Sequence, residues 1–167
     1  MAVESAAERG AIVPARGYRL VREQLIGRPR DEVFAFFADA ANLERITPEF
    51  LKFRITSPLP IKMRAGALIE YRLRLFGIPF NWQTLIESWD PPLRFTDVQL
   101  KGPYRKWHHT HDFVEVENGT LCVDTVDYEL PLGPLGTLAH ALFVRRSLDQ
   151  IFAYRCQVID QLLAGGI

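Results

Sequence analysis

The sequence contains very little cysteine, and this excludes several classes of protein. Its 167 residues include only two cysteines, Cys122 and Cys156. Two thiols cannot form a disulfide framework, and they cannot build a thiolate-rich metal site. We therefore predict that Cys122 and Cys156 do not pair with each other, and that the protein is cytoplasmic, in a reducing compartment.

Long apolar runs and an excess of one charge are also missing. Apolar stretches are broken within a few residues, far short of the roughly 20 residues that span a bilayer, so neither stable membrane insertion nor a secretory segment is expected. Lys and Arg number 20, and Asp and Glu number 20, which gives a formal net charge of +0. Because no global basic surface results, nucleic acid is not a predicted partner.

Motifs for common cofactors and for hydrolases do not occur either. There is no GxGxxG after a strand, no GxxxxGK[ST], no HExxH and no GxSxG. The sequence thus gives no sharp signal for dinucleotide binding, phosphate binding, zinc proteolysis or acyl hydrolysis. No cofactor is predicted.

The composition that is present is that of an ordinary globular domain, with 48% hydrophobic and 24% charged residues. The length suits a single domain. Residues 1–17 have no periodic apolar face, so we expect a flexible N-terminal tail followed by one domain over residues 18–167.

Alternation of apolar and polar residues predicts strands along the middle of the chain. Between Leu68 and Phe76, for example, every second residue is apolar, and Asn118-Gly119 is a strong signal for a hairpin turn. The predicted strands are Tyr18–Ile26, Leu68–Phe76, Phe80–Glu87, Arg94–Leu100, Arg105–Glu115 and Thr120–Leu130.

Helical periodicity predicts two short helices and one long helix. The first begins near Pro29, which suits a helix start, and the second covers about Ala41–Ile46. Apolar residues then recur at threes and fours from Pro134 to Leu163, which predicts one long amphipathic helix closed by Gly165-Gly166. We expect this helix to form one wall of an internal cavity. Its predicted inward residues include Leu138, Leu142, Phe152 and Ile159.

The order of these elements and several short motifs resemble the START-like, or SRPBCC, ligand-binding superfamily. The motifs are Pro29-x-x-x-Val33-Phe34, Asn42-Leu43 with Pro48 downstream, Trp89-x-Pro91-Pro92-x-x-Phe95, and Gly102-Pro103-Tyr104-x-x-Trp107-x-His109-x-His111-x-Phe113. The superfamily includes polyketide cyclase/dehydrase-like, coenzyme Q-binding and Bet v 1-like proteins. The resemblance implies an α+β helix-grip fold. In that fold, a curved antiparallel sheet of about seven strands wraps around a long C-terminal helix, with two short helices after the first strand.

Strand alternation also predicts which residues face the interior. Trp107 and Phe113 are too large and apolar to face water together, so His109 and His111, which share their parity, should point inward as well. For Arg94–Leu100 the parity is close to undecidable. An inward Phe95 would bring Asp97 and Gln99 inward with it. The other predicted inward residues are Tyr71, Leu73, Trp82, Thr84, Cys122, Asp124, Val126 and Tyr128.

This assignment brings His109, His111 and Asp124 together on an otherwise aromatic interior, and three interpretations stay open. The groups can form a structural hydrogen-bond network, recognise the polar head of an apolar ligand, or take part in catalysis or metal binding. Two histidines at i and i+2 can reach one ion, with Asp97 or Asp124 as a third ligand. A lone HxH is a weak signal without a fourth ligand, so no metal is predicted.

The leading hypothesis is a small soluble protein, monomer or homodimer, that binds a mainly apolar or aromatic molecule such as a lipid, a quinone or a polyketide-like compound. The alternative is a cyclase or dehydratase whose general acid and base are drawn from His109, His111 and Asp124. A third interpretation is an interaction module that acts on another protein. The predicted ligand-binding residues are Tyr71, Leu73, Trp82, Phe95, Asp97, Gln99, Trp107, His109, His111, Phe113, Asp124, Tyr128, Leu138 and Leu142.

Overall fold

The computed structural model describes residues 17–164 and contains one antiparallel sheet of seven strands. The strands follow the order β1-β7-β6-β5-β4-β3-β2, so the first strand pairs with the last and the others form sequential hairpins. Their bounds are β1 Tyr18–Ile26, β2 Arg54–Ile55, β3 Leu68–Leu75, β4 Ile78–Asp90, β5 Arg94–Lys101, β6 Lys106–Val116 and β7 Gly119–Glu129. The predicted tail, apart from Gly17, lies outside the described residues, as does Gly165-Gly166.

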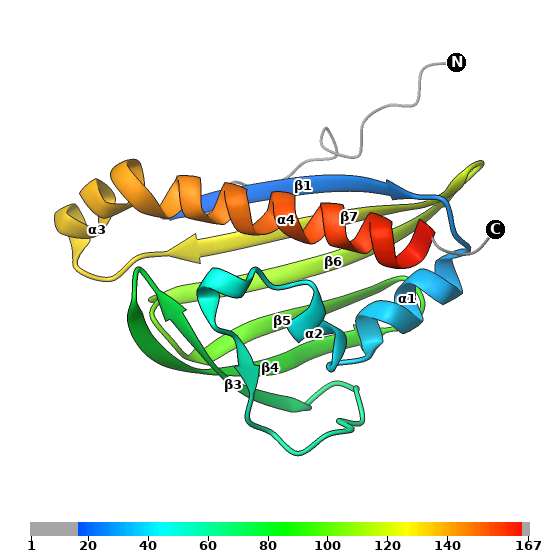
Figure 1. Ribbon diagram of the computed structural model, residues 1–167, viewed down its shortest axis with the longest axis horizontal. Coiled ribbons are helices and arrows are strands. Elements are labelled where there is room, and N and C mark those ends of the chain that lie inside the picture. The colour runs from blue at the N-terminus through cyan, green and yellow to red at the C-terminus, as the bar shows by residue number, and fades with distance from the viewer. Residues whose placement is uncertain (1–16, 165–167) are drawn as a thin grey trace.

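Helices cover one face of this sheet, which confirms the predicted helix-grip architecture (Figure 1). Two short helices and a 3₁₀ turn follow β1, and the chain ends in one long helix that lies along the sheet. The helical segments are α1 Arg30–Ala38, α2 Asn42–Arg45, η2 Glu49–Leu51, α3 Gly133–Ala139, η3 His140–Val144 and α4 Arg145–Ala164. Among them, none combines the length and apolar content needed to cross a membrane.

The start of α1 follows from its sequence. Pro29 precedes the helix, and its carbonyl accepts hydrogen bonds from the backbone N–H groups of Glu32 and Val33. Asp31 and Glu32 lie in the first turn, where the positive end of the helix dipole stabilises acidic side chains. Val33 and Phe34 are buried, and Phe34 packs edge-on against Phe113 of β6. The helix is thereby fixed to the centre of the sheet.

The strand predictions were accurate in position, with one omission. All six predicted strands are present with their ends shifted by at most a few residues, and the predicted inward faces of β3, β4, β6 and β7 are the buried ones. The two-residue strand β2 was missed because so short a segment carries no alternation to detect. β4 also runs on to Asp90, with register shifts at Gln83/Thr84 and Ile86/Ser88.

The long C-terminal helix is continuous, but its first part does not face inward as predicted. Leu138 and Leu142 are each 57% exposed, so their assignment to the cavity wall was wrong. The physical reason is the π-helical segment η3, which adds residues to a turn and rotates the faces before and after it. As a result His140, not the leucines, faces the sheet, where it bonds the Tyr128 hydroxyl at 2.8 Å.

After η3 the predicted face is correct. Leu148, Phe152 and Ile159 of α4 are all less than 5% exposed. Phe152 and Leu148 pack with Val126 and Tyr128 of β7, whereas Ile159 joins the aromatic core beneath α1. The inward side of α4 therefore contacts the sheet at two places along its length, and Phe152 lines the cavity described below.

Gly119 starts β7 and closes the predicted hairpin after Asn118. Its φ is +134°, and a Cβ at this position would lie 2.1 Å from the carbonyl oxygen of Ile26. Only glycine tolerates both the backbone conformation and the close approach of β1. The β6–β7 register begins at this residue, with Gly119 opposite Val116.

We predict that Gly119→Ala destabilises the protein by about 2 kcal/mol or more, because the added methyl group must displace backbone. Gly27→Ala is the matched control, since a Cβ there has no neighbour within 4 Å. The free energy of unfolding in urea measures both. Equal effects of the two substitutions would contradict the role assigned to Gly119.

Candidate functional site

A cavity of about 180 Å³ lies between the inner face of the sheet and the helices. Leu148, Ile151, Phe152 and Arg155 of α4 form one wall, as predicted for this helix. Phe36, Phe37, Leu43 and Ile46 close another side, and the sheet supplies the floor from β3 to β6. Most of these side chains are apolar, which is typical of sites that hold apolar small molecules.

Eight of the predicted site residues line this cavity and six do not. Those at the cavity are Tyr71, Leu73, Trp82, Phe95, Asp97, Trp107, His109 and His111. Those away from it are Gln99, Phe113, Asp124, Tyr128, Leu138 and Leu142. Alternation along the strands placed the first group correctly. The second group lies away from the cavity, either because other side chains stand in between or, for Leu138 and Leu142, because the π-helical segment η3 turns them outward.

Three of the six are held by other parts of the core. The Gln99 side-chain amide donates to the Tyr104 carbonyl at 2.7 Å, so it stabilises the loop between β5 and β6. Phe113 packs against Phe34 and Phe37 of α1. Tyr128 is buried beneath η3 and α4, where its hydroxyl bonds His140 and its ring packs with Leu148 and Phe152.

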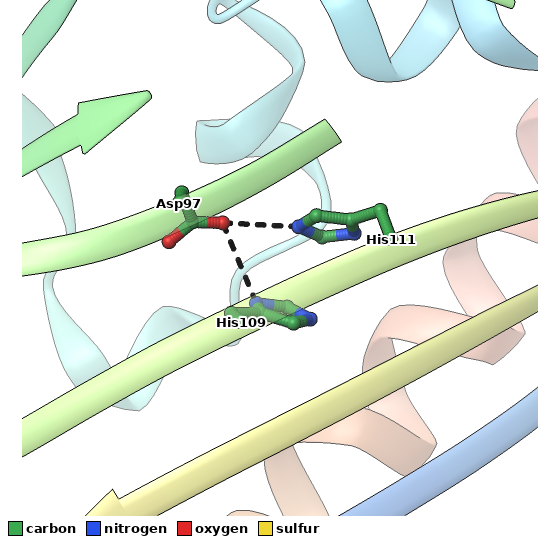
Figure 2. A group of neighbouring side chains, drawn as sticks. All are labelled: Asp97, His109 and His111. Atoms are coloured by element: carbon green, nitrogen blue, oxygen red, sulfur yellow. Dashed lines mark hydrogen bonds and ion pairs between the residues drawn. The ribbon is translucent and has the colours of Figure 1, made fainter. Parts of the chain in front are cut away.

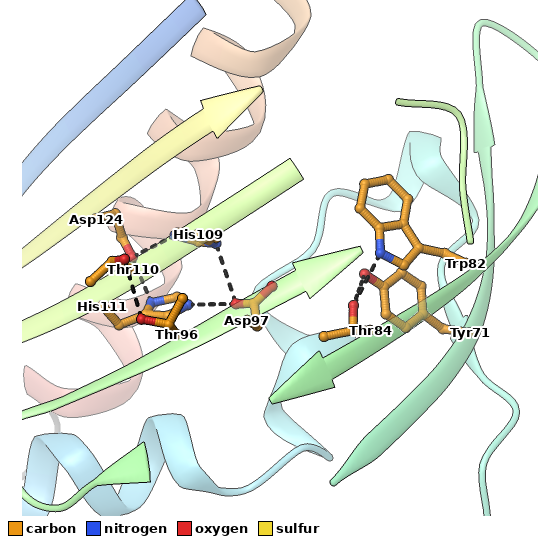
Figure 3. Close-up of polar contacts among 9 residues, drawn as sticks. All are labelled: Tyr71, Trp82, Thr84, Thr96, Asp97, His109, Thr110, His111 and Asp124. Carbon is orange, nitrogen blue, oxygen red and sulfur yellow. Dashed lines mark hydrogen bonds and ion pairs between the residues drawn. The ribbon is translucent and has the colours of Figure 1, made fainter. Parts of the chain in front are cut away.

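Four ionisable side chains, Asp97, His109, His111 and Asp124, form the polar wall (Figure 3). The two histidines alternate along β6, Asp97 lies opposite His109 on β5, and Asp124 lies opposite His111 on β7. His109 Nε2 bonds Asp124 Oδ1 at 3.0 Å, and His111 Nε2 bonds Asp97 Oδ2 at 3.0 Å. The prediction that a carboxylate lies within hydrogen-bond reach of these imidazoles is confirmed.

Two further contacts close the ring of four. His109 Nδ1 lies 3.6 Å from Asp97 Oδ2, and His111 Nδ1 lies 2.7 Å from Asp124 Oδ1. Asp124 Oδ1 does not lie along the N–H direction of His111 Nδ1. This contact is therefore electrostatic, and His111 Nδ1 has no hydrogen bond. Each imidazole thus lies between two carboxylates. The two imidazole rings are in contact, with centroids 3.8 Å apart and planes tilted by 39°.

The pKa values of these groups reflect burial, which disfavours their charged forms, and oppositely charged neighbours, which favour them. Burial and the neighbouring His111 lower the pKa of His109. Burial also disfavours imidazolium at His111, but the charge of Asp124 and contacts with both carboxylates outweigh it and raise the pKa of His111. The pKa of Asp124 is held well below its usual range, because Arg155 and both imidazoles outweigh the cost of burial. The pKa of Asp97 is lowered too, through His111 and His109.

A second polar cluster lies further along the cavity, on β3 and β4 (Figure 3). Trp82 Nε1 donates to Thr84 Oγ1 at 3.0 Å, and the Tyr71 hydroxyl shares a hydrogen bond with the same oxygen at 3.1 Å. The three side chains carry three donor hydrogens but make only two hydrogen bonds with one another. One hydroxyl hydrogen is therefore left over, whichever of Tyr71 and Thr84 donates to the other.

Arg155 is a cavity residue that our site predictions missed. Its guanidinium lies over the rings of Phe37 and Phe152, at 5.3 and 5.9 Å from their centroids. Its Nε is buried without a hydrogen-bond partner. The available signal was a charged residue at an apolar position of the α4 periodicity. Thr84 was placed on the correct face, but not among the site residues.

Three groups at the cavity are suited to hold a cation (Figure 2). One ligand atom each from Asp97, His109 and His111 lies within 4.8 Å of the others. Asp124 is on the far side of the imidazoles and does not line the cavity. The two cysteines lie elsewhere, each as a free thiol.

Comparison with known proteins places this architecture in a family. The family model described as "Polyketide cyclase / dehydrase and lipid transport" matches residues 26–152. The chain belongs to this family. Among the curated proteins, none matches the sequence. The family and the fold together indicate a ligand-binding helix-grip protein.

Solved structures agree on the fold. The Thermus thermophilus protein TTHA0849 is 20% identical with a TM-score of 0.71, and the match covers 89% of this chain and 100% of that one. A major latex-like protein of Panax ginseng is 12% identical with a TM-score of 0.65, over 87% and 97% of the two chains. A nucleoside-diphosphate sugar epimerase of Corynebacterium glutamicum is 25% identical with a TM-score of 0.64, but only 28% of that chain is matched, against 85% of this one.

We predict that Asp124→Asn lowers the free energy of unfolding by about 3 kcal/mol or more, because both imidazoles lose their shared carboxylate in a buried setting. Asp112→Asn is the control. Asp112 is on the outer face of β6, paired with the exposed Arg94, and its loss should cost less than about 1 kcal/mol. Urea unfolding measures both variants, and similar costs would show that the polar wall contributes no more than a surface ion pair.

Proposed function

We propose that this protein binds a mainly apolar, aromatic small molecule that carries oxygen groups, such as a quinone or a polyketide-like compound, or a lipid. The observation that carries the proposal is a mainly apolar cavity with a few polar groups gathered in clusters on its walls. Asp97, His109 and His111 reach the cavity, while Leu73 and Ile86 represent its apolar surface. An apolar body would be held by the aromatic and aliphatic walls, and its oxygen atoms would select the orientation.

The Tyr71–Thr84 pair supports a ligand with a hydrogen-bond acceptor. The leftover hydroxyl hydrogen of this cluster needs an acceptor, and a ligand carbonyl in the cavity would supply one. Burial raises the pKa of Tyr71 far above its usual range, so its hydroxyl stays protonated at neutral pH. Arg155 Nε adds a second buried donor at the same cavity.

Binding of a matched pair of probes tests the function. We expect 2-acetonaphthone to bind at least about tenfold more tightly than 2-ethylnaphthalene, of nearly equal shape, because only the ketone accepts the free hydroxyl hydrogen. Trp82 and Trp107 line the cavity, so quenching or shifting of tryptophan fluorescence reports occupancy. The triple variant Tyr71→Phe/Trp82→Phe/Thr84→Val removes all three donors of this cluster and should lose most of the ketone preference, with Trp107 as the remaining reporter.

Thr110→Val is the control for that experiment. Thr110 bonds Thr96 at 3.3 Å and does not line the cavity, so its loss should leave the ketone preference unchanged. Failure of the wild-type protein to bind either probe would refute the proposed binding function. Binding of both with equal affinity would refute the carbonyl preference alone.

A cyclase or dehydratase activity is a second candidate, favoured by the geometry of His109. Its Nε2–H donates to Asp124, so the lone pair of Nδ1 is on the cavity side, where it could take a proton next to a carbonyl. The one free hydroxyl hydrogen of the Tyr71–Thr84 pair would stabilise the enolate oxygen.

Hydrogen exchange tests this second candidate. With 2-tetralone in D₂O, we expect the protein to accelerate exchange of the protons next to the carbonyl, and His109→Ala to slow it by about 100-fold. His108→Ala, on the outer face of β6, serves as the control. Exchange at the rate of buffer alone would eliminate this candidate while leaving the binding proposal intact.

The free thiols of Cys122 and Cys156 also fit a cytoplasmic location, since such thiols persist in reducing compartments. Burial raises the pKa of the Cys122 thiol to about 12, so this group is protonated and unreactive at neutral pH.

A further inference from the structure

We propose that Asp97, His109 and His111 bind a divalent transition-metal ion, best matched by Zn²⁺, on the cavity side of the sheet. The site needs no organic ligand, so it stands independently of the proposed function. Two imidazole nitrogens and one carboxylate oxygen form a donor set preferred by zinc and its neighbours, whereas Ca²⁺ and Mg²⁺ prefer sites built from oxygen alone.

The spacing of the ligand atoms suits such an ion. Asp97 Oδ2 lies 3.0 Å from His111 Nε2 and 3.6 Å from His109 Nδ1 (Figure 2). Bonds of about 2.0–2.2 Å to a tetrahedral Zn²⁺ place neighbouring ligand atoms roughly 3.3–3.6 Å apart. Two of the three separations are therefore already close to those that an ion would require, and all three ligand atoms lie within 4.8 Å of one another.

The position of Asp124 behind the imidazoles also supports the site. Histidines that bind metals commonly donate their other ring N–H to a carboxylate, which fixes the tautomer and orients the ring. His109 does this through its Nε2–H, which donates to Asp124 Oδ1 at 3.0 Å. The Nδ1 lone pair is then free for an ion on the cavity side. Asp124 also lies 2.7 Å from His111 Nδ1.

One contact in the ring of four is unfavourable without a cation. When Nε2 of His109 carries the proton, Nδ1 presents a lone pair to Asp97 Oδ2 at 3.6 Å, and both atoms are acceptors. This distance is also too long for a hydrogen bond. An ion would replace the contact with two favourable bonds. It would displace the Nε2 proton of His111 to water, and the neutral His111 would keep its remaining proton on Nδ1, beside Asp124.

Charge and space are compatible with an ion as well. Two carboxylates, Asp97 and Asp124, balance the two charges of the ion when both imidazoles are neutral. The sequence offers no convincing fourth ligand, but zinc sites with three protein ligands keep one position for an exogenous group. The cavity borders all three ligands and gives that position room for water or for a ligand oxygen. Arg155, on the same cavity, favours an anionic oxygen there.

Metal titration of the untagged full chain tests the proposal, after chelator treatment and without any organic ligand. We expect calorimetry to show one Zn²⁺ per chain, and Co²⁺ to give the visible absorption bands of a four- or five-coordinate site. His109→Ala and His111→Ala should each weaken Zn²⁺ binding at least about 100-fold. His108→Ala should not change it, because His108 is on the outer face with Glu87.

Asp97→Asn keeps the shape of the side chain and guards against variants that fail to fold. It should weaken Zn²⁺ binding while leaving circular dichroism unchanged. The proposal is overturned if the wild-type chain shows no saturable binding at one ion per chain, since the polar wall is then a hydrogen-bond network only. It is equally overturned if His108→Ala abolishes binding and His109→Ala does not.

Discussion

The pairing of β6 with β7 is the constraint on which the rest of this structure depends. The two strands stay in register over eleven consecutive pairs, from Lys106 opposite Glu129 to Val116 opposite Gly119. This unbroken ladder places Asp124 opposite His111, while β5 on the other side places Asp97 opposite His109. The two imidazoles thereby acquire carboxylates on both sides from backbone geometry alone. The α4 helix then covers this arrangement and separates it from water.

Placing four ionisable groups in an apolar interior is costly unless each is matched. Here the matching is nearly complete among the four side chains themselves, with Arg155 contributing a further positive charge nearby. Apart from Arg30 Nε at the start of α1, the unmatched atoms lie at the cavity or beside it: Arg155 Nε, the Nδ1 atoms of the two histidines and one hydroxyl of the Tyr71–Thr84 pair. If the network only made the sheet rigid, its unpaired atoms would not be expected to gather around one cavity. Their location is what connects the polar wall to small-molecule chemistry.

Much of this arrangement could be predicted from the sequence, because strand parity is a local property. Trp107 and Phe113 fixed the inward face of β6, and with it the position of both histidines. What parity cannot supply is the relation between elements. It could not show that Asp124 lies behind the imidazoles, or that Gln99 turns away to bond Tyr104. The exposure of Leu138 and Leu142 follows from a π-helical segment, for which the apolar periodicity gave no signal because it continued through the segment unchanged.

Irregular strand pairing is confined to one part of the sheet. The β4–β5 pairing contains two register shifts, one with an extra residue on β5 (Leu100) and one with an extra residue on β4 (Glu87), whereas the β6–β7 pairing contains none. A residue inserted within β6 would exchange its faces and carry both histidines to the outside, so this strand has no freedom to change length. β4 already absorbs such a change as a bulge at Glu87, and its side chains line the cavity away from the polar wall. Insertions during evolution can therefore reshape the cavity on β4 while the polar wall is preserved. Relatives with this fold could accordingly diverge in the shape of molecule they accept and keep the same chemistry at its polar end.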